Sequence, residues 1–336
     1  MAITTLNIIR TSIFTLLKNF QFFSSSPSLV AVPFALAALL APSLAPSSRL
    51  FSLIHAHVTS LTLSAGVSRY SSQLSVALDY KLTQIILSSL LVSPFALSFL
   101  VVSKSIVIRA LQFSRPSRKN SPISWIVELK PLLITHLCNS LLVVSIHAVF
   151  FYFSVASFEF FRILGFSSIG ARVFLGLGLA VAYVVVIANL HVVCGISLVI
   201  SATERRGGFG GIVEAFVLTR QWMATALSLS VATNTALVAI EALFEYRVVR
   251  GYQHGTGPDP WMNLEAILVA YLYAVLVVLD TVVGYVFLKR CKEEYNNRHD
   301  DLCSCSCSCS FSYSFLIEIY EGNEKCLELK GLELML

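Results

Sequence analysis

Long apolar stretches alternate with short polar segments along most of the chain. Six of these stretches are long enough to cross a bilayer, because a spanning helix needs about 20 largely apolar residues. They run over Ser28–Pro46, Ile85–Ile108, Pro131–Phe158, Val173–Ser201, Met223–Phe244 and Asn263–Leu288. The first contains Pro33, Pro42 and Pro46, which membrane helices tolerate better than soluble helices do. The pattern therefore predicts an all-α fold, a polytopic membrane helical bundle of about six transmembrane helices.

A shorter periodic pattern precedes the first stretch. Apolar residues recur there at helical spacing, with Arg10 and Lys18 between them. The recurring positions are Ile3, Leu6, Ile9, Ile13, Leu16 and Leu17. This spacing predicts an amphipathic helix that lies at the membrane surface. A signal peptide cleaved near Ala45 is the alternative, but no soluble ectodomain follows it, which favours an uncleaved first span.

These patterns divide the chain into three regions. Residues 1–27 form the amphipathic N-terminal segment, and residues 28–289 form the six-span transmembrane domain. Residues 290–336 form a cytoplasmic, low-complexity tail that we expect to be disordered, in which serine alternates with the cysteines from Cys303 to Cys309. Four alternating thiols could hold a metal or accept acyl chains. A translated nucleotide repeat from a gene-model error is the simpler interpretation of this run.

Composition supports a membrane protein and excludes several other classes. Of the 336 residues, 56% are hydrophobic and 13% are charged, against about 45–50% and 25% in an ordinary soluble domain. The mean hydropathy is +0.76. These values exclude a disordered chain, a collagen-like fibre and a small disulfide scaffold. The eight cysteines are scattered in apolar segments or crowded near the C-terminus, so they imply no disulfide framework.

The positions of lysine and arginine predict how the bundle is oriented. If the N-terminus is cytoplasmic, the inside segments hold 14 of these residues and the outside loops hold 7. Short cytoplasmic loops carry such an excess, so both termini are predicted to be cytoplasmic. The net charge of +5 is modest and no basic run exceeds two residues, which argues against nucleic-acid binding.

One segment carries a resemblance to known proteins. Between the fourth and fifth spans, Glu204 is followed by a glycine-containing turn, then an amphipathic helix, and then Arg220 ahead of Trp222. This order resembles a plant family of multi-pass, six-span membrane proteins of unknown function, and more distantly the membrane domain associated with bacterial glycerophosphodiester phosphodiesterases. Gln221 departs from the glycine that is usual after the basic residue. The resemblance implies a topology and a plant source, and it implies no activity.

Several polar side chains fall inside the predicted spans, where ionisable groups are costly and point to function by default. The candidate intramembrane polar face consists of His136, Asn139, His147, His191, Glu241 and Asp280. If these helix faces converge, a proton relay or a metal site could form. The alternative is that each side chain makes a hydrogen bond between helices, worth roughly 0.6–2 kcal/mol. The alternative is favoured because no His-x-x-x-His or Glu-x-x-His pair occurs on a predicted span.

Four glycines between Gly207 and Gly211 resemble a phosphate cradle only superficially. Such a cradle needs a preceding strand, and its nucleotide-binding form needs a following Gly-Lys-Ser/Thr. We therefore expect a flexible turn ahead of a surface helix from Ile212 to Gln221. Beside this turn, Arg205 and Arg206 are candidates for contact with anionic lipid headgroups.

Together these features predict an integral membrane protein without an evident catalytic site, acting in membrane organisation or as a partner scaffold. A small-solute or proton-coupled transporter or channel that uses Asp280 and the His136/His147 face is the alternative. No catalytic residue, metal ligand or cofactor is predicted, and the expected partner is the lipid bilayer rather than a nucleic acid. The spans are compatible with the endoplasmic reticulum or the plasma membrane.

Overall fold

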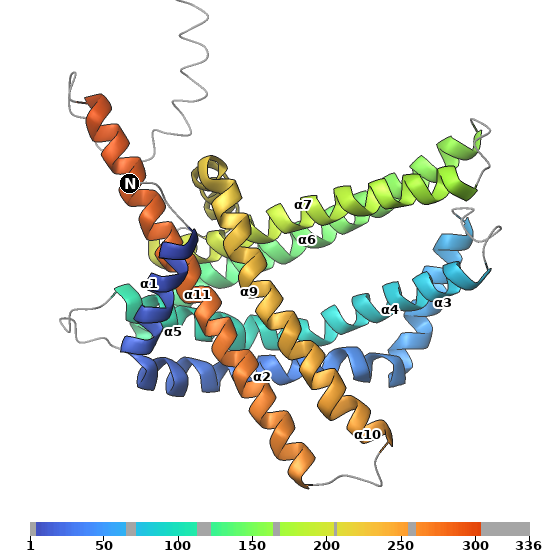
Figure 1. Cartoon of the computed structure of the whole chain (residues 1–336), viewed down its shortest axis with the longest axis horizontal. Coiled ribbons are helices and arrows are strands. Elements are labelled where there is room, and N and C mark those ends of the chain that lie inside the picture. Colours follow the sequence, from blue (N-terminus) through green and yellow to red (C-terminus); the bar gives the residue numbers. More distant parts are fainter. Residues whose placement is uncertain are drawn as a thin grey trace, which may run out of the picture. The chain divides into compact units, whose positions relative to one another are not determined.

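The computed structural model describes residues 5–64, 72–112, 122–163, 169–204, 207–254 and 260–303, and every element in these ranges is a helix (Figure 1). The α-helices are α1 Thr5–Lys18, α2 Phe20–Leu44, α3 Arg49–Ser64, α4 Ser72–Phe95, α5 Val101–Gln112, α6 Pro122–Ile163, α7 Ile169–Glu204, α8 Phe209–Thr219, α9 Met223–Phe244, α10 Arg250–His254 and α11 Pro260–Cys303. Short 3₁₀ or π turns continue some of them: η1 Ala45–Ser47, η3 Ala96–Leu100, η4 Arg220–Trp222 and η5 Glu245–Val249.

Six helical segments in the described residues are long and apolar enough to cross a membrane. They are Phe20–Ser47, Asp79–Gln112, Leu129–Phe158, Val173–Glu204, Phe209–Tyr252 and Trp261–Glu294. Each one contains one of the six predicted stretches, so the prediction of an all-α fold with six such helices is confirmed for the described residues. The chain divides into two units, Met1–Cys291 and Lys292–Leu336, and the packed core belongs to the first. The alternating Cys-Ser run after Cys303 lies outside the described residues.

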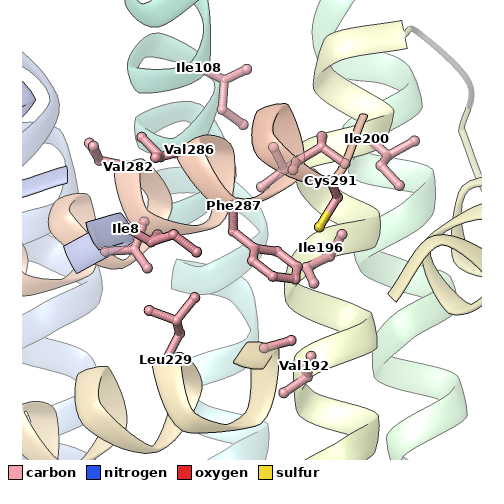
Figure 2. Close-up of a cluster of buried hydrophobic side chains, with 14 of the residues drawn as sticks. Ile8, Ile108, Val192, Ile196, Ile200, Leu229, Val282, Val286, Phe287 and Cys291 are labelled. Atoms are coloured by element: carbon pink, nitrogen blue, oxygen red, sulfur yellow. The ribbon is translucent and has the colours of Figure 1, made fainter. Parts of the chain in front are cut away.

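The main core forms where six helices meet. Apolar side chains from these helices and from a seventh, α2, which contributes Phe23, bury one another there: the other six are α1, α5, α7, α8, α9 and α11. Figure 2 shows Phe287 of α11 facing Ile196 of α7. Ile8 of α1 and Leu229 of α9 belong to the same cluster. Lipid tails are as apolar as leucine, so close packing rather than escape from water holds such a core together within a bilayer.

A second core joins α2 to the α9–α11 pair through small side chains. Ala31 and Ala35 on α2 are fully buried, and so are Ala270 and Ala274 on α11. Both pairs have the i, i+4 spacing that lets helix backbones approach closely. The Tyr271 hydroxyl donates to the backbone oxygen of Ser24 at 2.9 Å, which fixes α11 against α2.

Side chains satisfy two of the backbone carbonyl groups that prolines leave without a donor in α2 and η1. Pro27 has no N–H for the carbonyl of Phe23, and the Ser28 hydroxyl donates to that oxygen at 2.7 Å. Pro46 likewise has no N–H for the carbonyl of Pro42, which accepts from Gln84 Nε2 of α4 at 2.7 Å. Helix α2 continues through Pro27, Pro33 and Pro42, and Pro46 follows in η1.

Candidate functional site

Asn139 on α6 is the most completely bonded of the predicted polar residues. Its side chain is buried, and Nδ2 donates to the Cys194 backbone oxygen and to Ser197 Oγ on α7, both at 3.0 Å. Helices α6 and α7 run side by side (Figure 1). Asn139 is therefore a hydrogen-bonding link between two spans, as the interhelical interpretation expects.

Hydroxyl groups extend this link toward the start of α8. Thr135, one turn before Asn139, lies 2.7 Å from Ser201 of α7 between the two hydroxyl oxygens. Thr135 Oγ1 also accepts the backbone N–H of Gly208 at 2.8 Å, and Ser201 donates to the Ser197 backbone oxygen at 2.8 Å. Sequence analysis missed these hydroxyls, although their i, i+4 spacing to Asn139 and Ser197 was a visible signal.

The glycine turn before α8 is tightly packed, which corrects the expectation of a flexible turn. A Cβ on Gly207 would lie 2.7–2.9 Å from Cα, Cβ and O of Pro131. Gly208 has φ +79°, a backbone conformation that residues other than glycine rarely adopt. Helix α8 then runs over Phe209–Thr219, starting three residues before the expected helix. The headgroup candidates Arg205 and Arg206 lie outside the described residues.

The two acidic candidates, Asp280 and Glu241, lie along the seam between α9 and α11. Asp280 Oδ1 accepts from the Thr233 hydroxyl at 2.9 Å, and Glu241 Oε1 accepts from the buried Tyr273 hydroxyl at 3.1 Å. Asp280 and Tyr273 are seven residues apart on α11, which is two helical turns. Each carboxylate therefore has a hydroxyl donor on the opposite helix, and both bonds join the same two spans.

Ionisable groups on α5, α6, α7 and α11 lie within electrostatic range of one another in a chain that ends at Asp280. Lys104 on α5 lies within electrostatic range of the His136 and His191 imidazoles, and the Asp280 carboxylate lies within range of His191. The structure thus brings three of the candidates, His136, His191 and Asp280, into one electrostatic neighbourhood. The sequence analysis did not include Lys104 in that group, because its contribution depends on how α5 packs against α6 and α7.

His147 stands apart from this neighbourhood. Its ring packs edge-on against Tyr183 of α7, with 5.7 Å between ring centroids. Its Nδ1 is buried and makes no hydrogen bond to the described residues. The candidate face on α6 is therefore divided, because Asn139 and His147 contact α7 whereas His136 interacts with Lys104 of α5. In the part of the chain that the structure describes, no group of three or more His, Cys, Asp or Glu side chains could hold a metal ion.

Comparison with known proteins gives one match. Residues 1–303 match the family described as Domain of unknown function (DUF8558). No curated protein and no solved structure matches the chain.

Proposed function

The chain belongs to the DUF8558 family, whose function is unknown, and from that starting point we propose that it is a non-catalytic, multi-pass integral membrane protein. In this proposal it organises the membrane or serves as a scaffold for partner proteins, with the lipid bilayer as its permanent partner. Its six long apolar helices fit such a protein. A plant source and a distant relation to the phosphodiesterase-associated membrane domain stay predictions from the resemblance.

One observation carries the non-catalytic proposal. Three of the six candidate side chains take part in hydrogen bonds to a neighbouring helix: Asn139 bonds to α7, and Asp280 and Glu241 each accept a bond across the α9–α11 seam. A catalytic or transport group needs bonding capacity for its substrate, whereas these groups stabilise packing by roughly 0.6–2 kcal/mol each.

The proposal includes an orientation and a location. Both termini lie in the cytoplasm, because the excess of lysine and arginine falls in the segments on that side. The membrane is the endoplasmic reticulum or the plasma membrane. Microscopy of a tagged chain distinguishes the endoplasmic reticulum from the plasma membrane. Protection of a tag at either terminus from added protease tests whether that terminus is cytoplasmic.

A second candidate function rests on the charges around Asp280. Lys104 of α5 and Asp280 of α11 each lie within electrostatic range of His191 on α7. Groups that gain and lose protons inside a membrane can form a proton relay. This arrangement supports a proton-coupled carrier of a small solute as the alternative to a scaffold. His147 belongs to the α6 face that this alternative uses, and its ring packs against Tyr183.

Proton or solute flux in proteoliposomes separates the two functions. The purified chain is compared with Asp280→Asn, His136→Ala and the control Thr235→Val, whose hydroxyl bonds only within its own helix. The scaffold proposal expects no flux above empty vesicles from well-inserted protein across a broad solute panel. Flux that is lost in Asp280→Asn and His136→Ala but kept in Thr235→Val contradicts it and supports the carrier.

A further inference from the structure

Two short helices dock at the same end of the bundle. Ile8 and Leu16 of α1 belong to the main core cluster, and so do Ile212 and Ala215 of α8. The Thr5 and Ser228 hydroxyls, 3.0 Å apart, also tie α1 to the beginning of α9. With 14 residues, α1 is about 21 Å long and is too short to cross a bilayer by itself. The 11 residues of α8 begin the candidate segment Phe209–Tyr252, whose 44 residues exceed the length that one crossing needs, so α8 can lie at the membrane surface.

Each of these helices leaves an apolar face uncovered. On α1, Leu6 is 79% exposed and Phe14 is 67% exposed, and on α8, Phe209 is 65% exposed. The other large apolar side chains exposed on the two helices are Ile13, Leu17, Phe216 and Val217. A helix that buries one face in protein and leaves another face apolar suits the boundary between headgroups and acyl chains.

Basic residues accompany these apolar faces. Arg10 and Lys18 are exposed on α1, which contains no acidic residue. Arg220 is exposed directly after α8, and Lys289 is exposed beside Leu288, a member of the same core cluster. Glu214 on α8 offsets one of these charges, so α1, α8 and Arg220 together carry a net charge of +2, from Arg10, Lys18 and Arg220 against Glu214. This charge is complementary to anionic phospholipid headgroups.

We propose that α1 and α8 together form an interfacial surface that selects anionic phospholipids, with their uncovered apolar side chains among the acyl chains and Arg10 and Lys18 at the phosphates. The inference rests on the proposed integral-membrane function and names a lipid class for it. The surface consists of residues other than Arg205 and Arg206, which the sequence indicated as candidates for contact with anionic headgroups. Removing one such charge lowers the preference by up to about fivefold.

Electron spin resonance of spin-labelled lipids tests the inference on the full chain in phosphatidylcholine vesicles. The immobilised fractions of phosphatidylglycerol and phosphatidylcholine labels give their relative association constants. The wild type is expected to prefer phosphatidylglycerol, and the Arg10→Gln/Lys18→Gln variant is expected to lose most of that preference. The matched control Arg49→Gln/Lys81→Gln removes two charges from α3 and α4, outside the main core cluster, and is expected to keep it.

The outcomes distinguish this inference from the function on which it rests. Immobilised phosphatidylcholine with no preference for phosphatidylglycerol in the wild type overturns the lipid selectivity alone. Equal loss in the α1 variant and the control also overturns it, because the preference would then follow net charge. If neither label is immobilised, that result contradicts the integral-membrane proposal itself. A second variant, Phe14→Ser, is expected to weaken immobilisation of both labels because it removes exposed apolar contact.

Discussion

Gly207 lies against the backbone of Pro131, so close that a Cβ at position 207 would come within 2.7 Å of Pro131 Cα. This contact places the start of α8 against the early part of α6. The Gly208 N–H then donates to Thr135 Oγ1, which in turn contacts Ser201 of α7. A turn of two glycines therefore connects three helices. Glycine is required at position 207 because Pro131 leaves no room for a Cβ, and at position 208 because φ is positive.

Alanine at either of these glycines is expected to destabilise the protein. Gly207→Ala forces backbone to move, at a cost of about 1–3 kcal/mol. Gly208→Ala places a Cβ at positive φ, at about 1–2 kcal/mol. Gly210→Ala is the control, because its Cβ would meet nothing within 4 Å and alanine favours a helix. Thermal unfolding in detergent measures all three, and equal midpoints for Gly207→Ala and Gly210→Ala would contradict the packing argument.

Asn139 and Asn189 provide a matched pair on facing helices. Asn139→Ala removes two bonds to α7 and is expected to cost about 1–2 kcal/mol. Asn189→Ala removes only a bond to the Val185 oxygen on its own helix, so its effect is expected to stay within about 0.5 kcal/mol. Unfolding titrated with a denaturing detergent gives both values. A larger loss in Asn189→Ala would show that the α6–α7 link is not what stabilises this pair.

The hydroxyl of Ser28 is expected to stabilise α2 more than that of Ser25. Ser28→Ala leaves the Phe23 carbonyl, already deprived of a partner by Pro27, without its hydrogen bond inside the bundle, at about 1–3 kcal/mol. Ser25 is exposed and donates to Gln21 within a helix, so Ser25→Ala is expected to change little. Circular dichroism against temperature compares the two, and identical transitions would be inconsistent with this role of Ser28.

The six apolar helices could be predicted because span length is a local property of the sequence. The compensation of the α2 prolines could not, since Gln84 reaches Pro42 only after α4 has packed beside α2. The candidate polar face was predicted in part: Asn139 does contact α7, but Thr135 and Ser201 required the register between two helices.

The charges around Asp280 show the same limit. Sequence spacing placed His136 and His147 on one face of a helix, yet His136 interacts with Lys104 on α5 while His147 packs against Tyr183 on α7. Positions on one helix can be read from a period of 3.6 residues, but the helix that each position meets depends on tertiary packing. The proximity of His191 on α7 to Asp280 on α11 depends on this tertiary packing and could not be predicted from spacing along either helix.

A double-mutant cycle on Thr233 and Asp280 tests whether the α9–α11 seam is held by their hydrogen bond. The single variants Thr233→Val and Asp280→Asn and the double variant are unfolded under identical detergent conditions. Because the hydroxyl donates to Asp280 Oδ1 at 2.9 Å, we expect a coupling free energy of about 0.6–1.7 kcal/mol. Thr235 supplies the control cycle, since its hydroxyl donates to Val231 on its own helix and is expected to show coupling to Asp280 near zero. Equal coupling free energies in the two cycles would mean that Asp280 interacts with the polar groups of the seam in general and not with the Thr233 hydroxyl in particular. The interhelical hydrogen bond would then not explain why a carboxylate occurs at this position.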